Sequence, residues 1–216
     1  MVIGTERTLK AKMNDFDALQ QALTLQGRTV VDIGCGNGAI VRKLKEAGAD
    51  ALGVDIDVTA AKAQDPDGLY FQGGAEALPL ADQSVDVAVL FKSLHHVPDP
   101  HAAFPELHRV VKGHVYIAEP LPEGDFFELL RPVDDETHVR AVAQEAIAAA
   151  KGFDRAETVS YELELPLDRF EAFKGMVLSA DPERTKRFAQ LEPQLREAFS
   201  PGVYTIPMRA DVLTKR

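Results

Sequence analysis

A run of glycines that follows a carboxylate is the feature of this sequence best suited to chemistry. The apolar segment Val30–Ile33 leads into Gly34-Cys-Gly-Asn-Gly38, and a helical pattern follows. Glycines allow positive φ angles and let a ligand approach the backbone closely. The first turn of the following helix offers free N–H groups. We therefore expect a ligand-binding turn between a strand and a helix.

Two classes of ligand fit this turn. Gly34, Gly36 and Ala39 satisfy the dinucleotide pattern G-x-G-x-x-G/A. Asp32, however, stands two positions before the first glycine, and its carboxylate would repel a pyrophosphate seated on the helix N-terminus. It suits a ligand that lacks phosphate and carries an ammonium group, as S-adenosylmethionine does. Asp55 follows about 20 residues later, where an acidic group binds the ribose hydroxyls of either ligand. Asp57 is predicted to cap the next helix.

Two adjacent histidines are the candidates for proton transfer. His95 and His96 follow the apolar run Val85–Phe91. Histidine changes charge near neutral pH, and a general base typically accelerates a reaction by ~10²–10⁴-fold. A shared structural role in packing this loop is the alternative, and the sequence leaves both open. The acidic run Asp134–Glu136 predicts a helix start, because the helix dipole favours acidic residues there, and no metal site is expected.

Short apolar runs alternate with helical patterns from about residue 29 to residue 120, which is typical of a parallel sheet covered by helices. The predicted strands of this region are Thr29–Ile33, Ala51–Asp55, Leu69–Gln72, Val85–Phe91 and His114–Glu119. The predicted helices are Ala39–Ala47, Pro100–Val111 and one capped by Asn14 or Asp15. Later segments predict a helix over Asp134–Ala150, strands over Thr158–Leu165 and Val203–Leu213, and a helical stretch between them over Leu167–Phe199.

The composition suits a single soluble α/β domain. The chain has 216 residues, 45% of them hydrophobic, and a formal net charge of −10. This negative charge disfavours nucleic acid and anionic membranes as partners. A single cysteine, Cys35, excludes an intrachain disulfide and zinc held by several thiolates. The chain shows neither a signal-peptide pattern nor an apolar run of ~18 residues, so we expect a cytoplasmic protein.

Several linked segments together resemble the class I S-adenosylmethionine-dependent methyltransferases, and most closely their type-11 group, which includes ubiquinone and menaquinone C-methyltransferases. The segments are Val30–Gly38, Gly53–Ile56, Gly74–Leu80 and Asp86–Pro100. The resemblance covers roughly residues 28–120. It implies a Rossmann-like, doubly wound, mostly parallel seven-stranded sheet with helices on both faces and a helical insertion before the last, antiparallel strand. We expect one domain over residues 1–216, with a cofactor core at 28–120, substrate-side helices and insertion at 121–202, and the last strand at 203–216.

The resemblance also implies roles for individual residues. The loop Asp32–Gly38 would wrap the methionine part of the cofactor, Asp55 would hold the ribose, and Ile56 would pack on the adenine. The other implied contacts are the Ala75 N–H and the Glu76 carboxylate at the adenine edge, and Phe91 and Lys92 near the amino end. The predicted cofactor set is thus Asp32, Gly34, Cys35, Gly36, Asn37, Gly38, Asp55, Ile56, Ala75, Glu76, Phe91 and Lys92.

The implied reaction is in-line methyl transfer to a small-molecule acceptor, with S-adenosylhomocysteine as product and no metal. The acceptor is expected to be apolar or aromatic, contacted by Phe126, Phe127 and Arg131. Phe170, Phe173 and Met176 fit either an apolar lid or a packed helix stripe. The segment 108–114 lacks the proline of the family's usual turn, which predicts a tightened helix-to-strand connection. A nicotinamide-dependent oxidoreductase and a non-catalytic cofactor-binding protein remain the alternatives.

Overall fold

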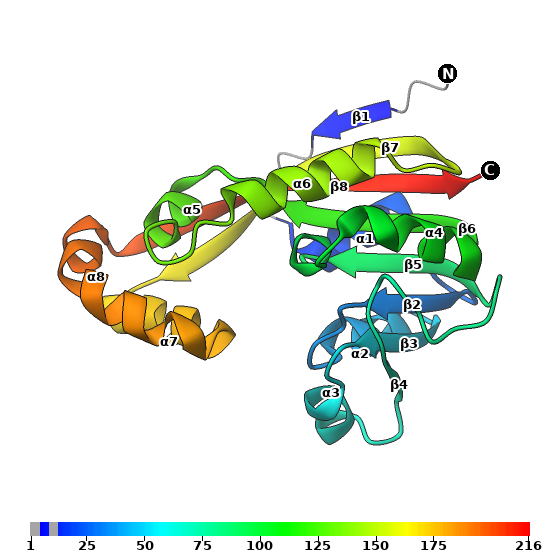
Figure 1. The fold of residues 1–216 in the computed structure, drawn as a ribbon, viewed down its shortest axis with the longest axis horizontal. Coiled ribbons are helices and arrows are strands. Elements are labelled where there is room, and N and C mark those ends of the chain that lie inside the picture. Colours follow the sequence, from blue (N-terminus) through cyan, green and yellow to red (C-terminus); the bar gives the residue numbers. More distant parts are fainter. Residues whose placement is uncertain (1–4, 9–12) are drawn as a thin grey trace.

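The computed structural model describes residues 5–8 and 13–216, and the described chain contains one mixed sheet (Figure 1). The strands lie in the order β1-β7-β8-β6-β5-β2-β3-β4. Their bounds are Thr5–Thr8 for β1, Thr29–Ile33 for β2, Asp50–Asp55 for β3, Leu69–Gln72 for β4, Val85–Phe91 for β5, Val111–Pro120 for β6, Phe153–Leu167 for β7 and Gly202–Lys215 for β8. The pairings of β8 are antiparallel and all other strand pairs are parallel. The predicted fold class is confirmed, and β1 extends the seven-stranded sheet by one short strand that the sequence analysis missed.

Helices cover both faces of this sheet. They are α1 (Asp15–Ala22), α2 (Ala39–Glu46), α3 (Thr59–Gln64), α4 (Pro100–Val110), α5 (Asp125–Leu130), α6 (Thr137–Ala148), α7 (Phe170–Ala180) and α8 (Thr185–Ala198), with short 3-10 turns η1 (Leu94–His96) and η2 (Pro182–Arg184). One apolar core includes Leu19, Val41 and Ala61 from α1–α3. A second includes Phe104 and Ile147 from α4 and α6, which lie in front of the sheet in Figure 1. Two cores on opposite faces are what a doubly wound sheet requires.

Element boundaries differ from the predictions in a few places. The helix expected from Asp134 begins at Thr137, because the Asp135 carboxylate accepts hydrogen bonds from the Thr137 N–H (3.1 Å) and hydroxyl (2.6 Å) and holds the preceding turn. No residue separates α4 from β6, so the connection is tightened as predicted. The sequence analysis missed α5 and η1 and gave no bounds for α3, because these elements are too short to give a clear apolar period.

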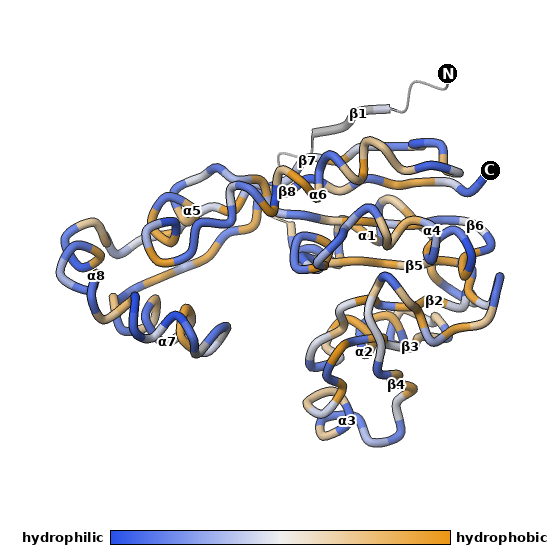
Figure 2. The backbone as a smooth tube through the Cα atoms, viewed as in Figure 1, coloured by the Kyte–Doolittle hydropathy of each residue, from blue (hydrophilic) through white to orange (hydrophobic). Residues whose placement is uncertain are grey.

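The outer ends of β7 and β8, together with α5, α7 and α8, form an extension that we call the arm. The arm projects beyond the carboxyl ends of the parallel strands, at the left of Figure 1. It has an apolar core of its own, and Figure 2 shows apolar stretches of the chain in the arm as well as in the sheet. Phe170 and Phe173 are 8% and 0% exposed in that core, with ring centroids 5.8 Å apart. These two residues therefore form a packed helix stripe and not a lid. Among the described residues, no helix is long and apolar enough to cross a membrane.

Candidate active site

The glycine turn lies where β2, β3 and β5 end. Gly34, Gly36 and Gly38 have φ angles of +77°, +51° and +74°. A Cβ on Gly34 would collide with the Ser93 side chain, and one on Gly38 would lie 2.5 Å from the Tyr70 hydroxyl. The backbone conformation and the close packing thus both demand glycine at these positions.

A cavity of about 480 Å³ opens beside this turn. Its lining comes from four segments and is mostly apolar, with a few polar side chains, as is usual in small-molecule sites. It lies between β2 and β5, where the strand order reverses, which is the usual ligand position in open α/β sheets. The lining residues are Ile33, Gly34, Asp55, Ile56, Gly73, Ala75, Glu76, Leu90, Lys92, Ser93, His96, Val97 and Pro98.

Half of the predicted cofactor set lines this cavity directly. These six residues are Gly34, Asp55, Ile56, Ala75, Glu76 and Lys92. The other six predicted residues are not part of the lining: Asp32, Cys35, Gly36, Asn37, Gly38 and Phe91. Ile33, Gly73, Leu90, Val97 and Pro98 were not predicted, because apolar lining residues look like ordinary strand and turn residues in a sequence. Ile56 is 76% exposed, an unusual position for an isoleucine, and it leaves a flat apolar surface on the cavity wall.

Asp32 is a buried carboxylate close to a second one. It is 2% exposed at the end of β2. Burial raises its pKa to about 7, and the negative charge of Asp55 adds to this increase. A carboxylate in this position is stabilised by a cation, so the inner end of the site favours a positively charged group.

Asp55 and Asp57 have distinct local roles. The Asp55 carboxylate accepts hydrogen bonds from the N–H groups of Gly36 (2.8 Å) and Asp57 (3.0 Å), which fix it at the cavity wall. The Asp57 carboxylate accepts from the Thr59 N–H (2.9 Å) at the start of α3, so its predicted capping role is confirmed. Asp55 keeps free lone pairs for a hydroxyl-bearing ligand.

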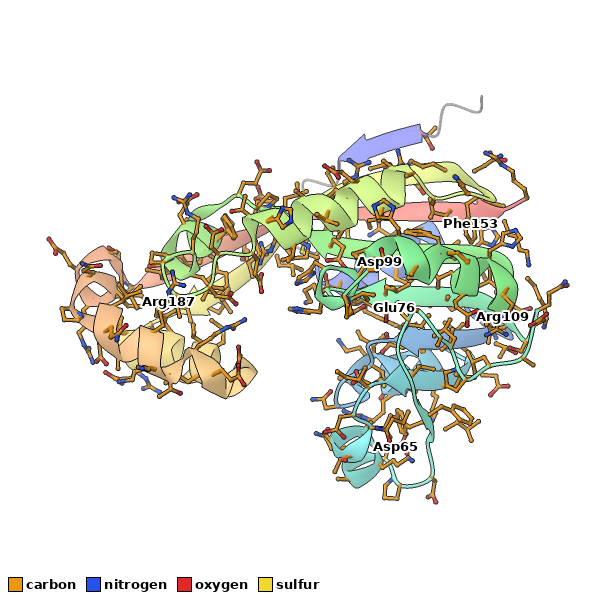
Figure 3. All side chains as sticks on the ribbon, viewed as in Figure 1. Asp65, Glu76, Asp99, Arg109, Phe153 and Arg187 are labelled. Carbon is orange, nitrogen blue, oxygen red and sulfur yellow. The ribbon has the colours of Figure 1, made fainter. Side chains whose placement is uncertain are left out.

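Two charged residues tie the rim of the cavity to neighbouring elements. The Glu76 carboxylate accepts from the Asp99 N–H (3.2 Å), and Figure 3 labels both residues in front of the sheet. Lys92 has a positive φ of 53° directly after β5. Its ammonium group lies 2.6 Å from Asp15 of α1, and the Tyr161 hydroxyl donates to the same carboxylate at 2.7 Å. The first helix is thereby fastened at the edge of the cavity.

The two histidines occupy different positions. His96 lines the cavity, whereas His95 is 5% exposed behind it. The His95 Nδ1 is hydrogen-bonded to Glu119, a fully buried carboxylate at the end of β6. Although His96 is exposed to solvent, partial desolvation lowers its pKa, and the neighbouring His95 lowers it further. The sequence analysis missed Glu119; an acidic residue directly after the buried run Val115–Ala118 was the signal for it.

His95, His96 and Glu136 offer ligand atoms that lie within 4.8 Å of one another. The Glu136 carboxylate, however, accepts two hydrogen bonds from Arg140, at 3.0 and 2.6 Å, and has Arg184 at 3.6 Å. Burial acts to raise the Glu136 pKa, but Arg140, and after it His95 and His96, lower it overall. Two guanidinium groups neutralise this carboxylate and repel a metal cation, so the geometry favours an ion-pair cluster over a metal centre.

The predicted acceptor residues lie in or next to α5, outside the cavity lining. Phe126 packs on Phe173 of the arm, with ring centroids 6.4 Å apart. Phe127 is buried beneath the Arg140 guanidinium, and Arg131 pairs with Glu128 at 2.7 Å. Their role in acceptor binding therefore stays a prediction.

Comparison with solved structures shows the same architecture elsewhere. A protein from Bacillus halodurans C-125, described as a methyltransferase, superposes with a TM-score of 0.67, at 18% identity over 93% of this chain and 98% of that one. A structure from Galdieria sulphuraria, described as a sarcosine dimethylglycine methyltransferase, gives a TM-score of 0.59, at 17% identity over 92% and 82% of the two chains. At these identities the likeness establishes the fold alone: that of a class I methyltransferase.

Comparison of sequences identifies the family. Residues 31–118 match the family model described as a methyltransferase domain, type 11. A ubiquinone biosynthesis O-methyltransferase of Ralstonia nicotianae is 30% identical over 149 residues, which cover 54% of this chain and 63% of that protein. An uncharacterized methyltransferase of Mycobacteroides abscessus is 38% identical over 106 residues, which cover 44% and 41%. The match thus spans less than two thirds of these curated relatives. Residues 31–118 thus form a methyltransferase domain of the type-11 group, which confirms the predicted resemblance over this part of the chain.

Proposed function

We propose that the chain is an S-adenosylmethionine-dependent methyltransferase that acts on a small-molecule acceptor. The observation that carries the proposal is the cavity beside the glycine turn, in which Asp55, Ile56 and Glu76 converge in front of the buried Asp32. A nicotinamide dinucleotide would bring a pyrophosphate toward two carboxylates, and S-adenosylmethionine brings a cation.

The described residues fit this cofactor part by part. Asp55 would accept from the ribose hydroxyls, and the exposed face of Ile56 would pack on the adenine. Ala75 and Glu76 would contact the adenine edge. Asp32 would stabilise the ammonium group, while the glycine turn leaves room for the methionine chain. When bound, the cofactor supplies an electrophilic methyl group on a sulfonium.

The protein would contribute mainly by holding the methyl donor and the acceptor in position. Holding two reactants in a productive geometry supplies ~7–11 kcal/mol of a barrier. Residues 28–120 would form the cofactor half of one domain, and residues 121–202 the acceptor half. The mostly apolar cavity wall favours an apolar or aromatic small molecule, and the negative net charge disfavours nucleic acid as the acceptor. Relatives named as ubiquinone biosynthesis O-methyltransferases support an acceptor of this kind.

Calorimetric titration tests the first part of the proposal. We expect S-adenosylmethionine and S-adenosylhomocysteine to bind with micromolar affinity and NADH not to bind. Ile56→Ala should weaken binding about tenfold, while Phe71→Ala, which truncates an exposed apolar side chain on β4 outside the cavity, should leave it unchanged. Binding of NADH in preference to the methyl donor would overturn the proposal.

Turnover is tested separately. Incubation with radiolabelled methyl donor and pools of small phenols, carboxylic acids and amines should yield a labelled small molecule. Tight cofactor binding without transfer to any pool would favour the non-catalytic binding protein.

A further inference from the structure

Glu119 is a fully buried carboxyl group at the end of β6, beside the turn that leads from β5 into the cavity wall. Its side chain is 0% exposed. One carboxylate oxygen accepts from the N–H groups of Ser93 (3.1 Å) and Leu94 (2.8 Å), and the other is bonded to Nδ1 of His95. A buried carboxylate is tolerated only when donors surround it, and charge-assisted hydrogen bonds are stronger than neutral ones. Glu119 therefore fixes the turn that follows β5.

This contact also selects the form of the His95 ring. Because a carboxylate accepts at Nδ1, the proton of neutral His95 is on Nδ1 and the Nε2 lone pair is free. The hydrogen bond fixes the ring orientation as well. His95 then lies against His96, with ring centroids 4.0 Å apart and an interplanar angle of 43°.

His96 is the histidine that a ligand in the cavity can reach. Partial desolvation and the neighbouring His95 lower its pKa, which favours the neutral ring that can accept a proton. Four charged or titratable groups act on it: His95 of η1 and Arg184 of η2 lower its pKa, whereas Glu136 beside α6 and Glu119 of β6 raise it. The downward effects dominate.

We propose that Glu119 is a positioning residue that acts through His95 to hold His96 as the general base toward an acceptor with an ionisable hydroxyl group. The inference rests on the proposed methyl transfer. The hydroxyl proton passes to a ring nitrogen of His96 and then to water. The acceptor oxygen uses the electron pair so released to form a bond to the methyl carbon. The sulfur–methyl bond breaks at the same time, and its electron pair stays on the sulfur, which becomes a neutral thioether.

Three variants separate these roles. Glu119→Gln keeps the size of the side chain, but its one amide oxygen cannot serve both the backbone N–H groups and His95. His96→Asn removes the base. Glu106→Gln is the matched control, because Glu106 also accepts from a backbone N–H, that of Leu78 at 2.8 Å, and pairs with Arg109, and neither Glu106 nor Arg109 lines the cavity.

The first readout needs no ligand. Nitrogen-15 spectra of the histidine rings in the free protein should show His95 with its proton on Nδ1, moving to Nε2 in Glu119→Gln and unchanged in Glu106→Gln. Affinity for S-adenosylhomocysteine should stay within threefold of wild type in all three variants. An unchanged His95 signal in Glu119→Gln would overturn the positioning role, whether or not the chain is a methyltransferase.

The second readout is the rate with a panel of aromatic hydroxyl compounds, with aromatic amines as comparison. We expect methylation of a hydroxyl compound, with a kcat that falls at low pH as His96 becomes protonated. His96→Asn should lower kcat by ~10²–10⁴-fold and abolish that pH limb, and Glu119→Gln should lower kcat at least tenfold with little change in KM. Methylation of amines alone, or His96→Asn with more than a tenth of the wild-type kcat, would overturn the assignment of the base.

Discussion

The glycine-turn edge of the sheet and the arm differ in the kinds of residue that they bury. At the ends of β2, β3 and β5, polar groups are buried and glycines adopt positive φ angles, and Asp32 sits there with a pKa of about 7. The arm has an aromatic core in which Phe173 is 0% exposed and contacts Phe126, Phe170, Phe188 and Phe199. Buried polar groups and positive φ angles lower the stability of the first region but create a ligand site. The second region gains its stability from packed aromatic rings. The difference indicates which substitutions should affect binding and which should affect folding.

Truncation of the arm core should have the largest effect on stability. Phe173→Ala should lower the free energy of unfolding by about 3–5 kcal/mol, because it removes a fully buried ring and leaves a cavity. Affinity for S-adenosylhomocysteine should stay within threefold when measured well below the melting temperature. Thermal unfolding and calorimetry together give the answer, and a tenfold loss of affinity would show that the two regions are not separate.

Asp32→Asn should have effects opposite to those of Phe173→Ala: a more stable chain at alkaline pH and weaker binding of the methyl donor. Its folded pKa of about 7 lies above the ordinary 3.8, so the native state holds the proton more tightly and wild-type stability falls as the pH rises from about 4 to 7. At pH 8 the variant should therefore be more stable, by up to roughly 4 kcal/mol. At pH 3.5 the difference should vanish.

The same substitution should weaken methyl-donor binding at least 100-fold at pH 8. Wild-type affinity should increase between pH 6 and pH 8 as Asp32 ionises, and the affinity of the variant should not. A Kd that is independent of pH in the wild type would contradict a contact between Asp32 and the ammonium group.

Arg184 tests the link between the two regions. Its guanidinium, in η2 of the insertion, pairs with Asp134 and lies 3.6 Å from Glu136. Arg184→Ala should cost about 1–3 kcal/mol, because it leaves partly buried carboxylates with fewer donors. Lys186→Ala, a nearby exposed position, serves as the control. A stability equal to that of the control would show that the arm does not depend on this ion pair.

Cys35 should show the smallest effect. Burial raises the pKa of its thiol to about 12, and Asp32 and Asp55 act in the same direction. Since the thiolate is the reactive form, iodoacetamide at pH 8 should leave the native chain unmodified for hours and modify it rapidly in denaturant. Mass spectrometry distinguishes these outcomes, and rapid modification of the native chain would indicate an open glycine turn.

The sequence predicted most of the sheet, because buried parallel strands read as continuous apolar runs such as Val85–Phe91. It also predicted the turn whose backbone requires glycine. It did not predict the lengths of β7 and β8, since their outer halves pair with each other beyond the sheet and their side chains alternate only weakly. The sequence also did not show that His95 is held behind the cavity while His96 lines it. This arrangement depends on the contact of His95 with Glu119, which lies 24 positions away along the chain.

The pairing of Leu167 with Gly202 has a consequence for how such chains diverge. These two residues are partners at the far end of the β7–β8 ladder, so any connection between them starts and ends at the same two neighbouring points. The entropy of closing a loop grows only slowly with its length. Insertions, deletions or complete replacement of residues 168–201 can therefore accumulate over evolution without any change in strand order, while the glycine turn at the other end of the chain stays unchanged.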